Sequence, residues 1–129
     1  MKRFKSYIPE EVTQKDIDGV EKFADKLFRH VGIDVEFTRH FKDRVNDKRN
    51  TKPINAAELT RLFKQTYKKH GKKIPPMGPD AEAVIHDMKT DVNMPFVLKY
   101  DSKTGELDLI AKTVMRKKNF QTPNQKLEV

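Results

Sequence analysis

The feature that most constrains the fold is an abrupt change of hydrophobic period at Gly32. Before it, apolar residues recur every three or four positions from Ile17 onward, and Thr13 with an acidic residue three places on is typical of a helix N-terminus. After it, apolar and polar residues alternate, as they do in a half-buried strand. Because glycine commonly ends a helix, we expect a helix over residues 14–31 joined directly to a strand over residues 33–37.

Three more helices are predicted downstream. Asn55, with a glutamate three places on, begins an apolar stripe that stops before Gly71 and predicts a helix over residues 56–70. Residues 39–49 contain only two apolar side chains, four apart, which indicates a short surface helix pinned to the core by these two. The apolar spacing within residues 80–89 also fits a helix.

The strand signals are concentrated in the second half of the chain. Residues 96–100 and 106–116 flank a turn that ends in Gly105, so they are expected to pair as an antiparallel hairpin. A further strand could lie near Ile74 or Val92. The whole pattern predicts an α+β fold in which N-terminal helices cover one face of a small antiparallel sheet and a β-hairpin lies near the C-terminus.

The length of 129 residues suits a single domain. We expect residues 1–12 to be an N-terminal extension or leader and residues 13–117 to form one α+β domain. Residues 118–129 are polar and contain a proline, so they are predicted to be a flexible tail.

The formal charge of +8 is unevenly distributed along the chain. Residues 36–75 carry 12 basic and 4 acidic side chains and residues 112–129 carry 5 and 1, whereas residues 76–111 carry 3 and 7. If the fold brings the two basic blocks together, they form the kind of positive face that binds nucleic-acid phosphates. For the lysines at 68, 69, 72 and 73 an ordinary solvated helix end is an equally simple explanation.

Several classes of function lack their usual signals. Cysteine is absent, which excludes disulfides, thiolate metal sites and a cysteine nucleophile and fits a reducing cytosol. The common motifs for metal-dependent, nucleotide and serine hydrolysis are also absent. His86, Asp87 and Asp91 could hold a hard metal ion, although such groups are more often simply solvated, and no metal or cofactor is expected. The longest apolar runs are too short to span a membrane, and no membrane partner is expected.

The most informative polar residues are His40 and Arg44. At positions i and i+4 of a helix they share one face. An imidazole can move a proton near neutral pH and a guanidinium can stabilise a phosphate, a combination that suits cleavage of RNA phosphodiesters. The alternative is that His40 caps or packs at the junction of strand and helix while Arg44 pairs with Asp43 or Asp47 on the surface.

A wider pattern resembles the small RelE-like and barnase-like nuclease fold, a group that includes toxin RNases and phage-encoded relatives. A strand is followed by His-x-x-x-Arg-x-x-x-x-Arg, then by an isoleucine that opens a helix containing Glu-Leu, and finally by a strand with Ala-Lys-Thr-Val-Met-Arg-Lys. These elements are His40, Arg44, Arg49, Ile54, Glu58, Leu59 and residues 111–117.

The resemblance implies a metal-independent endoribonuclease that attacks phosphate with a 2′-hydroxyl group. The implied catalytic residues are His40, Arg44, Thr113 and Arg116. RNA is favoured over DNA as the partner. The residues expected to bind nucleic acid are Arg39, Lys42, Arg49, Lys52, Lys68, Lys72, Lys112 and Lys117.

Two other functions remain open. The chain could be a non-catalytic phage internal or virion protein that binds nucleic acid or a host protein through the same basic face, with strong salt dependence and no turnover. It could also be an interaction protein in which the charge serves solubility alone. The oligomeric state is not predicted.

The first ten residues resemble the capsid-targeting leader of internal head proteins in large tailed phages. In that group the prohead protease cleaves after Leu/Ile-x-Glu, and Ile8-Pro9-Glu10 would be the site. An amphipathic start that packs its aromatic side chains is the simpler alternative. The resemblance implies a protein carried in the phage head that acts in the cytoplasm of the host cell.

Overall fold

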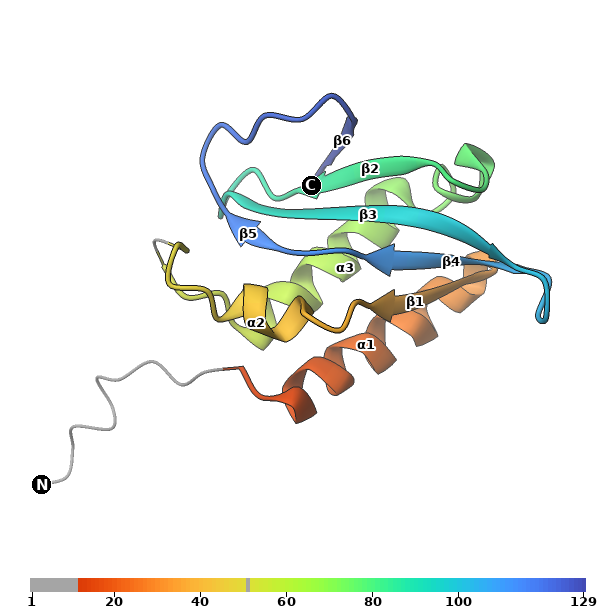
Figure 1. Ribbon diagram of the computed structural model, residues 1–129. Coiled ribbons are helices and arrows are strands. Elements are labelled where there is room, and N and C mark those ends of the chain that lie inside the picture. The colour runs from red at the N-terminus through yellow and green to blue at the C-terminus, as the bar shows by residue number, and fades with distance from the viewer. Residues whose placement is uncertain (1–11, 51) are drawn as a thin grey trace, which may run out of the picture.

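The computed structural model describes residues 12–50 and 52–129 and shows an α+β fold (Figure 1). Its helices are α1 (Gln14–Phe28), the short 3-10 turn η2 (Arg29–Val31), α2 (Phe41–Val45), α3 (Ala56–His70) and η3 (Pro75–Met77). Its strands are β1 (Ile33–Phe37), β2 (Glu82–His86), β3 (Val92–Asp101), β4 (Glu106–Ala111), β5 (Met115–Arg116) and β6 (Gln125–Glu128).

The two long helices begin where their caps predict. The Thr13 hydroxyl accepts the backbone N–H of Asp16, whose carboxylate accepts the N–H of Thr13 in return, and Asn55 makes the same exchange with Glu58. Such reciprocal bonds satisfy amides that the helix itself leaves unpaired. Gly32 follows η2 with φ of 74°, so the change from helix to strand predicted there is confirmed.

The strands form one mixed sheet in the order β1-β4-β3-β2-β6, with β5 paired to β3. The predicted hairpin is confirmed, because β3 and β4 pair antiparallel. The predicted α+β class is confirmed, but the sheet is mixed rather than antiparallel throughout: β1 pairs parallel to β4, and β6 pairs parallel to β2. Parallel neighbours require a long crossover, and the segment from α2 to β3 supplies it for β1 and β4.

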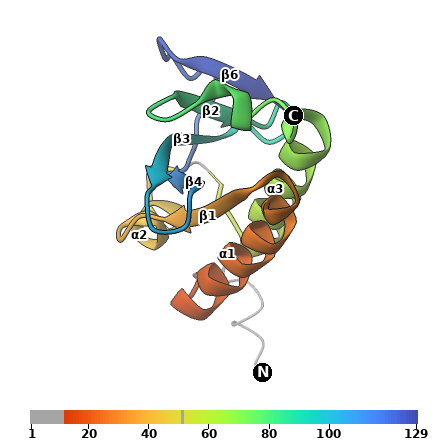
Figure 2. The ribbon, with the colours of Figure 1, turned by 90° about the vertical axis from the view of Figure 1, so that its right-hand side faces the viewer.

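Helices α1 and α3 pack on the same side of the sheet, as the turned view in Figure 2 shows. Large side chains fill the space between the layers, among them Phe28, Phe63 and Phe96, each at most 1% exposed. Burial of such apolar area is the main term that stabilises a small domain. In the described part of the chain no helix combines the length and the hydropathy that crossing a membrane requires.

Helix α1 also covers the free edge of the sheet. The Asp25 carboxylate accepts the backbone N–H of Val35 at 3.0 Å, and the Glu21 carboxylate accepts that of Phe37 at 2.9 Å. These two amides belong to β1, the outermost strand on that side. Helix side chains therefore replace the hydrogen bonds that a further strand would make.

The helix predicted over residues 80–89 is wrong, because strand β2 occupies this segment. Three consecutive residues, Ala83, Val84 and Ile85, are buried, and Met88 is 62% exposed, whereas a helix would have turned Met88 inward. Strand β2 lies between β3 and β6, and a short apolar run in such a strand has no period that distinguishes it from a helix.

The strand predicted over residues 106–116 is interrupted. Strand β4 ends at Ala111 and β5 begins at Met115. Separately, β3 starts at Val92, which is one of the two positions where the sequence indicated a further strand. The carbonyl of Pro95 accepts the N–H of Lys112 at 2.9 Å, but a proline has no N–H to return. Residues 112–114 therefore bulge out of the ladder.

The flexible tail predicted over residues 118–129 is wrong for its last part. Strand β6 pairs with β2, Leu127 is 3% exposed, and the carbonyl of Glu128 lies 2.8 Å from Nε2 of His70 on α3. The single buried leucine was too small a signal to predict a strand, since a lone apolar residue carries no period.

Candidate nucleic-acid interface

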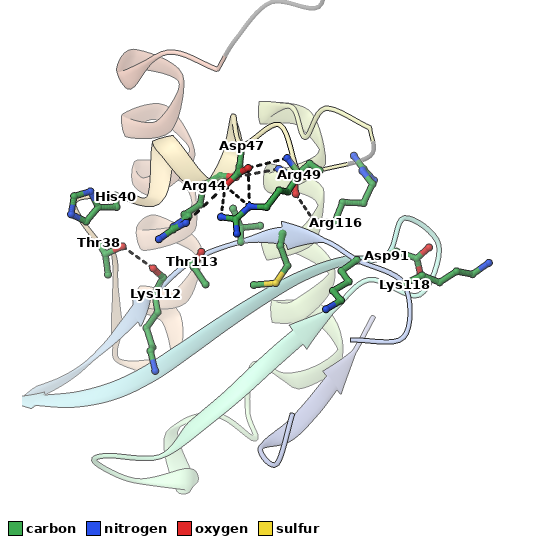
Figure 3. A pocket seen from close by; sticks show the side chains of 14 residues that line it. Thr38, His40, Arg44, Asp47, Arg49, Asp91, Lys112, Thr113, Arg116 and Lys118 are labelled. Carbon is green, nitrogen blue, oxygen red and sulfur yellow. Dashed lines mark hydrogen bonds and ion pairs between the residues drawn. The ribbon is translucent and has the colours of Figure 1, made fainter. Parts of the chain in front are cut away.

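A groove of about 940 Å³ lies between α2 with the turn after it and the segment 112–118 (Figure 3). We call it the α2 groove. Six basic and two acidic side chains line it, together with a histidine and two threonines. In Figure 3, His40 and Thr38 lie at one end, Asp91 and Lys118 at the other, and Arg44, Arg49 and Thr113 between them.

One wall of the groove is α2, which two apolar side chains attach to the core. Phe41 and Val45 are 0% and 1% exposed, as the spacing in residues 39–49 predicts, although the helix itself covers only residues 41–45. The ring of Phe41 stacks on Phe37 with centroids 4.2 Å apart and planes 11° apart. So short a helix depends on these contacts, because its own hydrogen bonds are too few to hold it.

Asn50 joins this wall to the opposite one. Its side-chain NH₂ donates to the carbonyls of Arg44 and Val45, both at 3.1 Å, and its Oδ1 accepts the backbone N–H of Arg116 at 2.9 Å. Near the other end of the groove, the Thr38 hydroxyl donates to the carbonyl of Lys112 at 2.8 Å. Two segments far apart in sequence are thus held at a fixed separation.

Arg116 borders the groove, but its guanidinium faces partners on the protein side. The side chain is 7% exposed and forms an ion pair with Glu58 at 2.8 Å. It also donates to three backbone carbonyls, those of Lys52, Pro53 and Thr90, at 2.8–2.9 Å. With its donors occupied in this way, the catalytic role predicted for Arg116 does not fit its contacts, and we assign it to holding the groove together.

Asp47 partly neutralises the middle of the groove. Its carboxylate accepts from Nε and Nη2 of Arg49, the closest contact being 2.7 Å, and lies 3.8 Å from Arg44. Hydrogen bonds from the Arg49 side chain and backbone are the main cause that lowers the pKa of Asp47 from its ordinary 3.8 to about 2. Asp47 is therefore ionised at neutral pH and is not a proton donor there.

We predict that an NMR titration of the Asp47 carboxyl has its midpoint near pH 2 and that Arg49→Gln moves it back toward 3.8. Since the folded pKa is the lower one, this contact stabilises the fold above the ordinary pKa and ceases to do so as the pH falls through about 2. An unchanged midpoint in Arg49→Gln would show that Arg49 is not the cause.

His40 immediately precedes α2, where its side chain makes no capping hydrogen bond, and it is accessible. Its side chain is 73% exposed, and Nδ1 lies 3.7 Å from the Asp43 carboxylate. The contact with Asp47 gives Arg44 one of the surface pairs that the alternative interpretation predicts. Both residues nonetheless line the groove with Thr113, so the structure brings His40, Arg44 and Thr113 to one place.

The other predicted binding residues are distributed over several surfaces. Lys112 borders the α2 groove but pairs with Glu82 at 3.0 Å, whereas Lys117 is exposed there. The neighbouring Lys118 also lines the groove and was missed by the sequence interpretation, although it belongs to the same basic block. The remaining residues line other hollows or lie outside them, namely Arg39 and Lys42 beside α1, Lys68 and Lys72 at the far end of α3, and Lys52 in the loop before it.

The possible metal ligands are used in other ways. Asp87 is 3% exposed and pairs with Arg61 at 3.1 Å, and Nδ1 of His86 contacts the Asn93 side chain at 2.7 Å. Within residues 12–50 and 52–129, no three His, Asp or Glu side chains are grouped as metal ligands.

An acidic patch lies along β1 and the neighbouring strand β4. Asp34 and Glu36 alternate with the buried residues of β1, and Asp34 lies in register with Asp108 of β4. Burial is the main cause that raises the pKa of Asp34 and Glu36, and neighbouring carboxylates, among them Asp108, raise both further. A surface of this sign repels phosphates.

Comparison of the chain with protein-family models, curated proteins and solved structures gave no match. The nuclease fold and the phage leader therefore stay predictions from the sequence, and residues 1–10, which carry the leader pattern, lie outside the described residues.

Proposed function

We propose that this protein binds the phosphate backbone of single-stranded RNA in the α2 groove. The observation that supports the proposal is the meeting of two basic segments, residues 39–49 and 112–118, along one hollow surface. Steering of a phosphate chain depends on cations gathered along one surface rather than on net charge alone. Because the first ten residues resemble a phage capsid-targeting leader, we further propose that this is a phage-type protein that acts in the cytoplasm of the host cell.

The available cations differ in how they would act. Within the described chain, Lys117 and Lys118 form no ion pair, so they are free to contact phosphates, while Arg44 and Arg49 share the single carboxylate of Asp47. No Phe, Tyr or Trp is among the described residues that line the groove. Without a stacking platform the bases contribute little, and we expect backbone binding with weak base preference.

We expect Lys117→Gln/Lys118→Gln to weaken binding of an oligouridine of about 12 nucleotides roughly tenfold at low salt. Fluorescence anisotropy at several salt concentrations measures this directly. Each lost phosphate contact should reduce the slope of log affinity against log salt by about 0.7, the value for a single strand.

The matched control is Lys68→Gln/Lys72→Gln, which removes the same charge at the far end of α3. Our proposal predicts that this control leaves RNA affinity nearly unchanged. Equal losses in the two variants would mean that RNA responds to net charge, and an absence of salt-dependent binding by the unaltered protein would contradict the proposal outright.

RNA cleavage is the second candidate function, favoured by the accessible imidazole of His40 beside the Asp43 carboxylate. In this reaction the imidazole accepts the proton of a 2′-hydroxyl, whose oxygen bonds to phosphorus as the bond to the 5′-oxygen breaks. The product is a 2′,3′-cyclic phosphate, and the departing oxygen takes a proton from solvent. Arg44 is placed to stabilise the charge on phosphorus-bound oxygens. Since Asp47 is ionised, it does not supply a proton to the departing oxygen, and we therefore rank binding first.

Incubation of labelled RNA with the protein in EDTA separates the two functions. Cyclic-phosphate products that disappear in His40→Gln support catalysis, because glutamine keeps polarity but accepts no proton near neutral pH. Cleavage that persists in His40→Gln excludes His40, and intact RNA in a sample that binds it leaves binding as the function.

A further inference from the structure

A second groove, of about 680 Å³, lies between the C-terminal ends of α1 and α3, and we call it the lysine groove. Its charged lining consists of Lys64, Lys68, Lys69, Lys72 and Lys73, with no aspartate or glutamate among the lining residues. Its apolar lining consists of Leu27, Val31 and Tyr67, all partly buried against the core. It lies along the C-terminal half of α3 and shares no lining residue with the α2 groove.

The helix end does not account for this concentration of charge. A favourable dipole interaction is confined to the last turn and so applies to Lys68 and Lys69. Lys64 precedes that turn, and Lys72 and Lys73 follow the helix. In the described part of the chain none of the five forms an ion pair, so their mutual repulsion is uncompensated.

A close approach of the backbone at Gly71, directly after α3, brings Lys72 and Lys73 to the groove. A Cβ atom on Gly71 would lie 2.5 Å from the carbonyl oxygen of Tyr67, so only glycine fits this close approach without a shift of backbone. The residues that follow, Lys72 and Lys73, then line the same hollow as Lys64. The path of the backbone at Gly71 therefore determines where Lys72 and Lys73 lie relative to the groove.

The bottom of the groove is suited to aliphatic side chains. Leu27 and Val31 offer exposed hydrocarbon, and the Tyr67 ring already packs against Phe28 and His30, with centroids 5.5 and 6.3 Å apart. Phosphates and sugars gain little from such a surface, whereas leucine-like side chains gain by burial. Lysines around an apolar surface complement a ligand with the reverse pattern, carboxylates around apolar groups.

We infer that the lysine groove binds an acidic amphipathic segment of a partner protein, a helix with glutamate or aspartate on both sides of an apolar stripe. Such a helix in a groove is a common mode of recognition, in which the apolar side chains provide affinity and the charges orient the partner. This site is independent of RNA binding, because it uses other residues at the other end of α3.

The test uses the full chain and a synthetic helix of about 16 residues, four turns, with leucine at helical spacing and glutamate elsewhere. We expect fluorescence anisotropy to show saturable binding, about tenfold weaker in Lys68→Gln/Lys72→Gln. The matched control Lys117→Gln/Lys118→Gln, at the other groove, should bind the peptide as the unaltered protein does. Since the substitutions relieve repulsion, the thermal midpoint of Lys68→Gln/Lys72→Gln should not fall, which verifies folding.

Three further ligands complete the experiment. A polyglutamate peptide of equal charge should bind at least tenfold more weakly than the amphipathic helix, because it cannot use Leu27 and Val31. Equal binding of the two peptides, or equal loss in both lysine variants, overturns the inference. Tighter binding of phosphatidylserine vesicles through Lys68 and Lys72 also overturns it in favour of a phosphate ligand, without affecting the proposal for the α2 groove. Tighter binding of oligouridine through the same two lysines overturns it as well, and in addition contradicts the proposal that RNA binds in the α2 groove.

Discussion

Replacing Arg116 with methionine is expected to lower the free energy of unfolding by about 3–5 kcal/mol. The substitution keeps an unbranched stem but removes every donor from a side chain that is 7% exposed. It leaves the Glu58 carboxylate without its cation and three backbone carbonyls without a donor. Urea denaturation followed by circular dichroism measures the loss.

Two controls define what this loss means. Lys117→Met changes the adjacent, exposed residue and should alter stability by no more than about 0.5 kcal/mol. Arg116→Met/Glu58→Gln should lose less than Arg116→Met alone, because no partly buried carboxylate then lacks its cation. If Arg116→Met were as stable as the unaltered protein but lost function, Arg116 would belong to the chemistry and our assignment would be wrong.

Phe41→Ala is the second substitution with a large expected effect, a loss of about 3–5 kcal/mol. The ring is 0% exposed and stacked on Phe37, and it attaches a helix of only five residues to the core. Its removal should therefore also loosen the wall that carries His40 and Arg44. Amide hydrogen exchange of residues 41–45 then becomes faster than in the unaltered protein.

Phe23→Ala is the matched control for Phe41→Ala. Phe23 lies on α1 and is 37% exposed, so the same truncation there should cost only about 1 kcal/mol or less. Similar losses at the two positions would indicate that α2 does not depend on the stacked pair. Protection of residues 41–45 that survives Phe41→Ala would lead to the same conclusion.

The parts of the fold that local chemistry determines were predictable. Thr13 and Asn55 begin their helices through bonds to residues three places away, and Gly32 ends one, so a short window of sequence contains the cause. Strand β2 was not predictable because its three consecutive apolar residues owe their burial to β3 and β6. The parallel pairing of β1 with β4 likewise depends on residues more than 70 positions apart.

The site was predictable to a similar degree. His40, Arg44 and Thr113 line one groove as the pattern suggested, since each belongs to a basic block and follows a strand. The sequence also identified Glu58 as a capping residue, but it carries no sign that the same carboxylate pairs with Arg116. Lys68 and Lys72 were expected on the same surface as the other basic residues of the block 36–75, but they lie in a different groove. The reason is that the 15-residue helix α3 separates the two ends of this sequence block in space.

The helix carboxylates at the edge of β1 bear on how this protein behaves at high concentration. An outer strand with free amides is a template on which a neighbouring molecule can add its own strand and start aggregation. Here Asp25 and Glu21 already hold the amides of Val35 and Phe37, so an incoming strand must first displace two charged acceptors. Extension of the sheet into a chain of molecules is thereby opposed at the edge that β1 forms.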